Sequence, residues 1–539
     1  MTDQRKRHAP QVRSRNRPNP DMSSEQADGR FARDTDSFLE HFVPHRAVHD
    51  PECKGARPSL RVMKFGGTSV GDAACIRRVV EIIQNASTKG DLVVVVSAMS
   101  GVTNKLIEAA TRSAARDRGQ AGGILKELCR QHETAAKALI HSEPERDRIG
   151  RKTTELFAEC ERWCDSTAVL GELTPRMRDS ISSLGERLSA PLVAAALAAR
   201  GVSSEAIDAT ELIVTDAYFG GADPKMDLTR ARCEARLRPL LRQGIVPVVT
   251  GFVGATEEGV LTTLGRGGSD FSATILGAAL NAEEVTIWTD VDGMLTADPH
   301  LVPDASTIPE ISYREAAELA YFGAKVLHPK TLRPVMQSGI PVWIRNTFAP
   351  EKSGTKITPT GHTCNGGVKA LTAVSDAALI TVGGPALGGM VDLVGRALAT
   401  TAAARTDVLM VCHSPACNRV CLVVAATFAQ RTVEALRREF ASDSKHEGMD
   451  HVTVDSTVSI LTVVGQNLHV VKGIVGRAVD ELGRENVNII ATAQGSSDHN
   501  VSMVVARKDI KTALVTTHRE FQLCILDPPQ DRRPEAQLL

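Results

Sequence analysis

A glycine-rich turn followed by a helix of small residues is the stretch of this sequence best suited to chemistry. It spans residues 263–280 (TLGRGGSDFSATILGAAL), with Arg266 and Asp270 near its start. Glycines before a helix let the backbone close around an anion, which free N–H groups and the positive end of the helix dipole then hold. Arg266 suits a planar carboxylate or phosphate, and Asp270 suits a cation or a lysine. Such a turn is also a common tight connection, so its meaning depends on the rest of the chain.

Three further turns with reactive side chains follow stretches that we interpret as strands. They are residues 64–69 (KFGGTS), residues 97–104 (SAMSGVTN) and the pair Thr289-Asp290. In an open α/β sheet, ligands collect at the carboxyl ends of the strands. Backbone donors, a cation and carboxylates are what phosphoryl transfer to an acidic acceptor requires. Walker A, G-x-G-x-x-G and H-E-x-x-H patterns are absent from the sequence, so the common nucleotide and zinc interpretations fail.

The elements that would position these turns alternate between strand and helix. Residues 60–65 predict a strand, an apolar helix face follows at about 76–83, and the run at 92–96 predicts a strand buried on both faces. A strand, a helix and a second strand make a βαβ unit, so we expect a mainly parallel sheet. The pattern is then mostly helical from about 105 to 200, and strands return at 245–250, 285–289 and 342–344.

The last third of the chain contains an internal repeat. A stretch rich in Pro, Gly, Thr and Ser at 350–367 precedes it and reads as a linker. Strands at 371–382 and 422–425 then surround a helix at 391–404. The same order recurs as a strand at 458–464, a helix at 473–482 and strands at 488–493 and 501–505. The sequence therefore predicts two copies of a small β-α-β unit.

Composition disfavours several classes of partner. A chain of 539 residues is long enough for three or four domains, and 42% hydrophobic residues suffice for packed cores. A net charge of −1 and 4% aromatics give no reason to expect nucleic acid. We find no apolar run of membrane-spanning length and no signal peptide. The eleven cysteines lack C-x-x-C pairs, which favours reduced thiols and a cytoplasmic location. Residues 1–59 lack periodicity and predict a disordered leader.

Six motifs in order give the chain a resemblance to aspartokinase, of the amino-acid-kinase fold. They are KFGGTSVGD, SAMSGVTN, SLGERLSAPL, TLGRGGSDFSA, WTDVDGM and FGAKVLHPKTL, and the resemblance covers roughly residues 60–525. The repeated units resemble the ACT domains of that family. The resemblance implies a three-layer αβα sandwich with a mainly parallel sheet, plus two ferredoxin-like βαββαβ units. The expected domains are a catalytic domain at 60–349, a linker at 350–370, a first ACT unit at 371–440, possibly completed by 506–526, and a second ACT unit at 456–505.

The resemblance implies that ATP phosphorylates the side-chain carboxylate of L-aspartate, giving 4-phospho-L-aspartate on the route to lysine, threonine and methionine. Lys64 would stabilise charge on the transferring phosphoryl group, and Asp270 would hold Lys64. Glu186 would bind the α-ammonium group and Arg266 the α-carboxylate. His328 is interpreted as a packing or capping residue. Ser97 and Thr103 would also line the aspartate pocket, and the residues implied to bind ATP or its phosphates are Lys64, Gly66, Gly67, Ser69, Gly267, Gly268, Ser269, Thr289, Asp290 and Lys325.

Departures from the family pattern affect the nucleotide and effector sites. Leu295 stands where a tyrosine is usual and His300 where an arginine is usual, each of which should weaken ATP binding by ~1 kcal/mol. The second ACT unit keeps Gln494 and Asn500, which resemble effector contacts, whereas the first unit departs at residues 413–418. One effector site, or none, is as compatible with the sequence as two. The effector would be lysine or threonine, Mg²⁺ would be a cofactor without an assigned metal ligand, and the chain would form a homodimer or larger assembly.

Two other interpretations stay open. The first is a catalytically weak amino-acid sensor on a kinase scaffold, which Leu295 and His300 motivate and which intact Lys64 and Asp270 oppose. The second keeps the enzyme class but changes the acceptor, as in glutamate or acetylglutamate kinases; Glu186 with Arg266, and the paired ACT units, favour aspartate.

Overall fold

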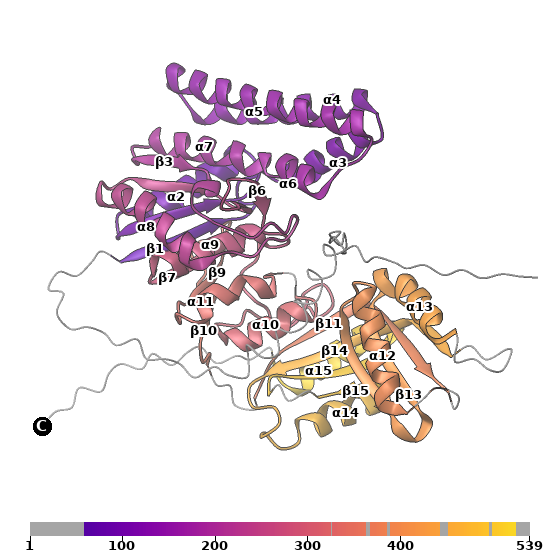
Figure 1. Ribbon diagram of the computed structural model, residues 1–539. Helices are drawn as coiled ribbons and strands as arrows, with labels where there is room; N and C mark the ends of the chain where they lie inside the picture. Colours follow the sequence, from indigo (N-terminus) through magenta and orange to yellow (C-terminus); the bar gives the residue numbers. More distant parts are fainter. Residues whose placement is uncertain are drawn as a thin grey trace, which may run out of the picture. The chain divides into compact units, whose positions relative to one another are not determined.

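The computed structural model describes residues 59–324, 326–362, 367–384, 387, 389–441, 451–494 and 498–523 (Figure 1). All of these residues lie in the second of the two compact units into which the chain divides, Arg57–Leu539. The predicted leader lies outside the described residues, apart from Ser59.

An eight-stranded sheet forms the centre of the region expected from the sequence to be catalytic, called the catalytic part below, and its strand order is β3-β4-β2-β1-β7-β9-β10-β8. Neighbouring strands are parallel except for β9 and β10, so the expected mainly parallel sheet is confirmed. A separate two-stranded hairpin of β5 and β6 follows β4. The strands are β1 (Leu60–Phe65), β2 (Asp91–Val96), β3 (Ser204–Ile207), β4 (Val246–Thr250), β5 (Val253–Ala255), β6 (Leu261–Thr263), β7 (Glu284–Thr289), β8 (Glu310–Ser312), β9 (Val342–Asn346) and β10 (Thr355–Thr358).

Helices cover both faces of this sheet, which makes a three-layer αβα sandwich. Successive side chains of a strand point to opposite faces, so Met63 and Phe65 of β1 enter one core while Leu60 and Val62 enter the other. The first core is closed by α2 (Ala73–Ser87), α3 (Val102–Ala114), α4 (Arg118–Leu139), α5 (Glu143–Leu170), α6 (Pro175–Ser182) and α7 (Leu184–Ala198). The second is closed by α8 (Met226–Arg242), α9 (Gly268–Leu280), α10 (Tyr313–Tyr321) and α11 (Arg333–Met336).

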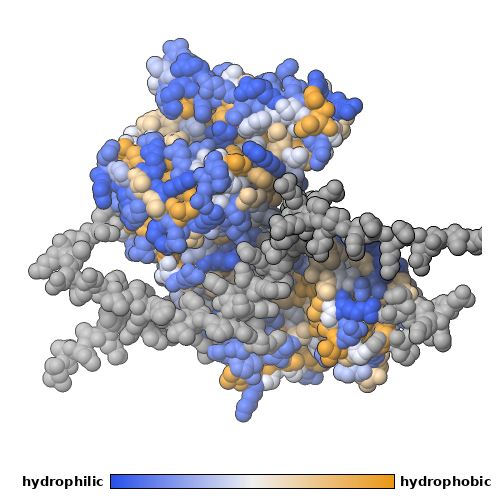
Figure 2. Space-filling view, in the orientation of Figure 1, coloured by the Kyte–Doolittle hydropathy of each residue, from blue (hydrophilic) through white to orange (hydrophobic). Residues whose placement is uncertain are grey.

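The two longest helices, α4 and α5, lie side by side in Figure 1 at the edge of the catalytic part. Figure 2 shows that the face they turn to the viewer is largely hydrophilic. Among the described residues, no helix has both the length and the apolar character needed to cross a membrane.

A six-stranded antiparallel sheet forms the C-terminal part, in the order β12-β13-β11-β14-β16-β15. Its two central strands are long and serve both repeats. The C-terminal half of β11, from Ala377, pairs with β13, whereas the C-terminal half of β14, from Val458, pairs with β16. The elements are β11 (Val368–Gly383), α12 (Met390–Ala403), β12 (Val408–Ser414), β13 (Arg419–Ala425), α13 (Ala426–Phe440), β14 (Val452–Gly465), α14 (Ile474–Arg484), β15 (Ile489–Ala493), β16 (Asn500–Ala506) and α15 (Ile510–Glu520).

Each half of this sheet is a βαββαβ unit, and the two units exchange strands. The first unit uses the C-terminal half of β11 and ends in the N-terminal half of β14. The second unit begins in the C-terminal half of β14, and the N-terminal half of β11 supplies its fourth strand. The segment 506–526, which the sequence analysis considered as a possible completion of the first unit, contains α15 (Ile510–Glu520). This helix instead shares the hydrophobic core of α14 and β16 in the second unit.

The segment interpreted as a linker also contains a strand. Thr355–Thr358 form β10, which pairs with both β9 and β8 of the catalytic sheet. The Pro and Gly residues around it indicated an irregular connection, but the short Thr-Lys-Ile-Thr stretch has the β-branched residues that suit a strand.

Candidate active site

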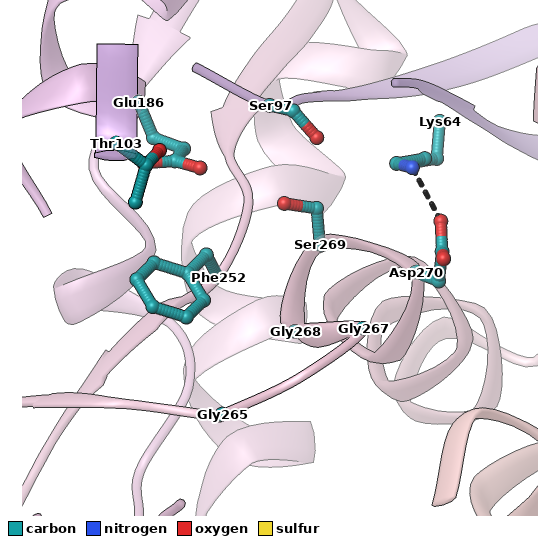
Figure 3. A pocket seen from close by; sticks show the side chains of 10 residues that line it. All are labelled: Lys64, Ser97, Thr103, Glu186, Phe252, Gly265, Gly267, Gly268, Ser269 and Asp270. Carbon is teal, nitrogen blue, oxygen red and sulfur yellow. Dashed lines mark ion pairs between the residues drawn. The ribbon is translucent and has the colours of Figure 1, made fainter. Parts of the chain in front are cut away.

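A pocket opens where the carboxyl ends of β1, β2 and β4 meet the first turn of α9. Lys64 comes from β1, Ser97 follows β2, Thr103 lies in the first turn of α3 and Glu186 in the first turn of α7. Figure 3 shows Glu186 and Thr103 on one side of the pocket and Lys64 with Asp270 on the other. The complete lining is Lys64, Ser97, Thr103, Glu186, Phe252, Gly265, Gly267, Gly268, Ser269 and Asp270.

Lys64 and Asp270 form an ion pair at one side of the pocket. Their side chains are only 9% and 14% exposed. A buried charge is costly unless it is paired, so each group holds the other in its ionised form. The pair leaves an ammonium group at the carboxyl edge of the sheet, where it can face an anionic ligand.

The first turn of α9 supplies backbone donors next to this ammonium group. Gly267 caps the helix with φ +68°, and a Cβ atom at this position would lie 2.7 Å from Cβ of His328. Both the left-handed backbone and the close approach require glycine there. Because the first N–H groups of a helix have no partner within it, the turn around Ser269 is suited to bind an anion.

Glu186 is a buried carboxylate with an unsatisfied oxygen. The residue is 4% exposed, and among the described residues Oε2 has no hydrogen-bond partner. Burial raises the pKa of Glu186 to about 8, although the backbone N–H of Ala98 and the charge of Lys64 act to lower it. A carboxyl group in this state is well suited to bind an ammonium group, which would supply both the missing donor and the missing charge.

A close packing contact brings Glu186 to the pocket. A Cβ atom at Gly185 would lie 2.5 Å from Cβ of Ala98, so only glycine allows α7 to approach the turn after β2 this closely. The SLGE sequence at the start of α7 therefore combines a packing residue, Gly185, and a binding residue, Glu186.

Two lining residues, Phe252 and Gly265, were missed by the sequence analysis. Phe252 lies just beyond β4 with φ +70°, and its ring packs so closely on Gly268 that a Cβ atom there would approach Cδ2 to 2.6 Å. Its position in the sequence could have identified Phe252. The strand at 245–250 was predicted, and ligands collect at the carboxyl ends of such strands, but the residues after this strand were not considered.

Arg266 is exposed and does not line the pocket, although its neighbours Gly265 and Gly267 do. Gly66, Gly67 and Ser69 also lie outside the lining. The hydroxyl of Ser69 is fully buried and is 2.7 Å from the hydroxyl of Thr347, and the N–H of Gly66 donates to the carbonyl of Trp288. These contacts fix the turn after β1.

The residues implied to face the nucleotide follow β7. Thr289 donates through its hydroxyl to Oδ1 of Asp290 at 3.1 Å. Leu295 is half-buried and pairs with Thr307, and His300 is exposed. Lys325 lies outside the described residues. His328, interpreted from the sequence as a packing or capping residue, accepts through Nδ1 from the N–H of Lys330 and caps a short helical turn.

The described part of the chain shows no metal-ligand cluster, and the two predicted effector contacts differ in their surroundings. No group of three or more His, Cys, Asp or Glu side chains there could hold a metal ion. Gln494 is exposed at the end of β15, whereas Asn500 donates to Oε2 of Glu318 at 2.7 Å. Since Glu318 lies on α10, Asn500 joins the antiparallel sheet to a helix of the catalytic part.

The fold and this site together define an α/β protein with an anion-binding pocket at the carboxyl edge of a mainly parallel sheet. Residues 59–346 match the amino acid kinase family, and residues 461–521 match an ACT domain. Aspartokinase 1 of Arabidopsis thaliana chloroplasts is 31% identical over 475 residues, which cover 85% of this chain and 80% of that protein. The bifunctional aspartokinase/homoserine dehydrogenase of Haemophilus influenzae is 30% identical over 473 residues, which cover 85% of this chain and 56% of that protein.

Solved structures similar to this chain are also aspartokinases. Aspartokinase III of E. coli in complex with aspartate and ADP has a TM-score of 0.71 and 29% identity, covering 86% of this chain and 99% of that chain. The same enzyme with lysine and aspartate has a TM-score of 0.70 at 28% identity, with the same coverage. The chain belongs to the aspartokinases, within the amino acid kinase family. It spans about half the length of the bifunctional relatives that it matches.

Proposed function

We propose that the chain transfers the γ-phosphoryl group of ATP to the β-carboxylate of L-aspartate. The observation that carries this proposal is the pairing of two unlike groups in one pocket. Glu186 offers an unsatisfied buried carboxylate on one side, and Lys64 offers an ammonium group on the other. An amino acid whose α-ammonium group binds Glu186 would direct its side-chain carboxylate toward Lys64.

The hydroxyl groups of Ser97 and Ser269 lie between these two ends of the pocket (Figure 3). They are placed to donate to an acceptor carboxylate that spans the distance. Arg266, exposed beside the pocket, is free to bind the α-carboxylate through its planar guanidinium group. Together these residues would recognise an acidic α-amino acid by both of its ends.

The transfer needs positioning and charge stabilisation more than acid–base chemistry. The acceptor carboxylate is already ionised at neutral pH, so no base is required. Its oxygen forms a bond to the γ-phosphorus, the bond from that phosphorus to the bridging oxygen breaks, and ADP leaves with the electron pair. Lys64 and the N-terminal turn of α9 would stabilise the negative charge on the transferring group. Bound Mg²⁺ would neutralise phosphate charge, and no ligand among the described residues is assigned to it, because Asp270 is paired with Lys64 and no metal-ligand cluster lies in that part of the chain.

Regulation and assembly complete the proposal. The antiparallel C-terminal sheet would bind an amino-acid effector, lysine or threonine, and reduce catalysis by feedback. The E. coli relative was solved with lysine, which supports lysine first. We also propose a homodimer or larger assembly in the cytoplasm, and a role in the first step toward lysine, threonine and methionine.

The amino-acid sensor is the second candidate, because Leu295 and His300 replace residues that usually contact the nucleotide. A hydroxylamine trap for the acyl phosphate separates the two functions. Purified protein with ATP, Mg²⁺ and aspartate should form aspartyl hydroxamate, Lys64→Ala should slow its formation at least about 100-fold, and lysine or threonine should reduce it. No turnover at saturating ATP, with lysine or threonine still bound, would favour the sensor.

A further inference from the structure

A buried carboxylate outside the pocket connects the elements that carry its two recognition groups. Asp179, on α6, is 2% exposed and accepts three hydrogen bonds. Its Oδ1 accepts from the hydroxyl of Thr263 at 2.8 Å, and its Oδ2 accepts from the N–H groups of Thr263 and Gly220, both at 2.9 Å. The mechanism above assigns no role to this group.

On one side, Asp179 is joined to the helix that carries Glu186. Its carbonyl accepts from the N–H of Ser183 at 3.0 Å, and Ser183 both ends α6 and begins α7. Glu186 lies in the first turn of α7, seven residues after Asp179. The position of Asp179 is therefore tied to the position of the carboxylate proposed to bind the α-ammonium group.

On the other side, Asp179 holds the turn that carries Arg266. Thr263 ends β6, three residues before Arg266. Gly265, between them, has φ +79°, and a Cβ atom there would lie 3.0 Å from the carbonyl oxygen of Gly220. The two residues whose N–H groups donate to Asp179 thus lie on either side of the Gly265 turn. Thr263 precedes Gly265 in the chain, and Gly220 packs against it.

Two opposing effects act on the pKa of the buried Asp179 carboxyl group. Burial raises the pKa of Asp179, while its N–H and O–H donors lower it. A carboxylate with three donors makes stronger hydrogen bonds than a neutral amide could make at the same place. Since a buried acid is rarely the most stable choice, its position between two recognition elements suggests a role in spacing.

We propose that Asp179 is a positioning residue that fixes the separation of Glu186 and Arg266, and thereby sets the affinity for the amino-acid acceptor. This inference rests on the proposed function, because it takes Glu186 and Arg266 as the groups that bind the two charged ends of the acceptor. Asp179 does not line the pocket, so its effect would reach the acceptor only through these two elements.

The test uses the full chain and separates the KM for aspartate from the KM for ATP. Asp179→Asn preserves shape but turns an amide N–H₂ group toward N–H or O–H donors, so we expect the KM for aspartate to rise at least tenfold. The KM for ATP should change less than twofold. Thr263→Val removes only the hydroxyl donor and should raise the KM for aspartate about threefold to tenfold, whereas Thr263→Ser should restore the wild-type value.

Thr229→Val is the matched control, because it removes another fully buried hydroxyl that accepts from a backbone N–H, that of Val214, outside the pocket. It should leave both KM values unchanged. If Asp179→Asn does not fold, the Thr263 pair carries the test. An unchanged KM for aspartate in folded Asp179→Asn or Thr263→Val, or an equal rise in both KM values, would overturn the inference. A wild-type chain that makes no acyl phosphate would instead refute the proposed function. Calorimetric titration with aspartate would then test the role of Asp179. Equal binding of aspartate by the wild type and the Asp179→Asn variant, or no binding by either, would overturn the inference.

Discussion

The protonation of Glu186 should control how tightly the pocket binds aspartate. Burial raises the pKa of this carboxyl group to about 8, so most of it is neutral in the empty pocket at pH 7. An ammonium group binds the ionised form, because that form accepts hydrogen bonds and neutralises the ligand's charge. Binding at neutral pH must therefore release a proton, and the apparent affinity must improve as the pH rises toward 8.

The expected size of the effect follows from the fraction of ionised carboxylate. With a pKa of about 8, that fraction rises roughly 25-fold between pH 6.5 and pH 8.5. The KM for aspartate should fall by a similar factor, while the KM for ATP should stay nearly constant. Glu186→Gln removes the titration, so its KM for aspartate should be high and independent of pH over the same range.

Two assays measure this effect. Initial rates from pH 6.5 to 8.5 give both KM values, and calorimetric titration of aspartate in buffers of different ionisation enthalpy counts the released protons. The raised pKa of Glu186 also affects the stability of the fold. Between pH 4.5 and 8 the folded chain without ligand binds more protons than the unfolded chain. The stability that protonated Glu186 contributes therefore decreases over this range and is lost as the pH rises through 8. Glu186→Gln should lack that loss. A KM for aspartate that stays flat in the wild type, without proton release, would refute the argument that burial keeps Glu186 neutral.

Three further substitutions test other parts of the structure. Lys64→Ala should lower kcat about 100- to 1,000-fold by removing charge stabilisation, whereas Lys105→Ala, which breaks an exposed ion pair, should leave kcat unchanged. Gly267→Ala should destabilise the chain by at least ~1 kcal/mol in thermal unfolding, because its φ is positive and a Cβ atom collides; Gly122→Ala, with open space in α4, should be neutral or stabilising. Burial lowers the pKa of His132, so the unfolded state binds more protons below about pH 6.5 and stability falls with acidity. His132→Gln should reduce this loss, measured as the difference in the free energy of unfolding between denaturant titrations at pH 7.5 and pH 5.5. An unchanged difference would contradict the argument.

The sequence predicted the catalytic sheet and most of the pocket because both depend on local patterns. The apolar runs of β1 and β2 are buried on both faces, and polar turns directly follow them. Eight of the ten lining residues, including Lys64 and Glu186, lay in the predicted set. The likeness of the motifs to aspartokinases supplied their roles.

Other features depend on contacts between distant segments, which a single sequence does not display. Phe252 reaches the pocket because its ring packs on Gly268. Asp179 accepts hydrogen bonds from Thr263, which lies 84 residues later in the sequence. The strand exchange within β11 and β14 is similar. The sequence predicted strands at 371–382 and 458–464, but only the pairing partners show that each of the two long strands serves both units. Local propensity identifies such strands but does not determine their neighbours.

The proposed feedback regulation requires a physical connection between the two sheets, and the loop after β7 offers one. Ala297 and Val302 are buried in the same hydrophobic core as α14 and α15 of the second unit. The carbonyl of Thr296 accepts from the N–H of Leu371 at 2.8 Å, and its hydroxyl lies 2.9 Å from Nε2 of His518. Packed cores change between discrete arrangements rather than deforming smoothly. A shift of α14 and α15 would therefore move the loop that follows Thr289 and Asp290, so an effector bound to the C-terminal sheet should change the KM for ATP through this contact.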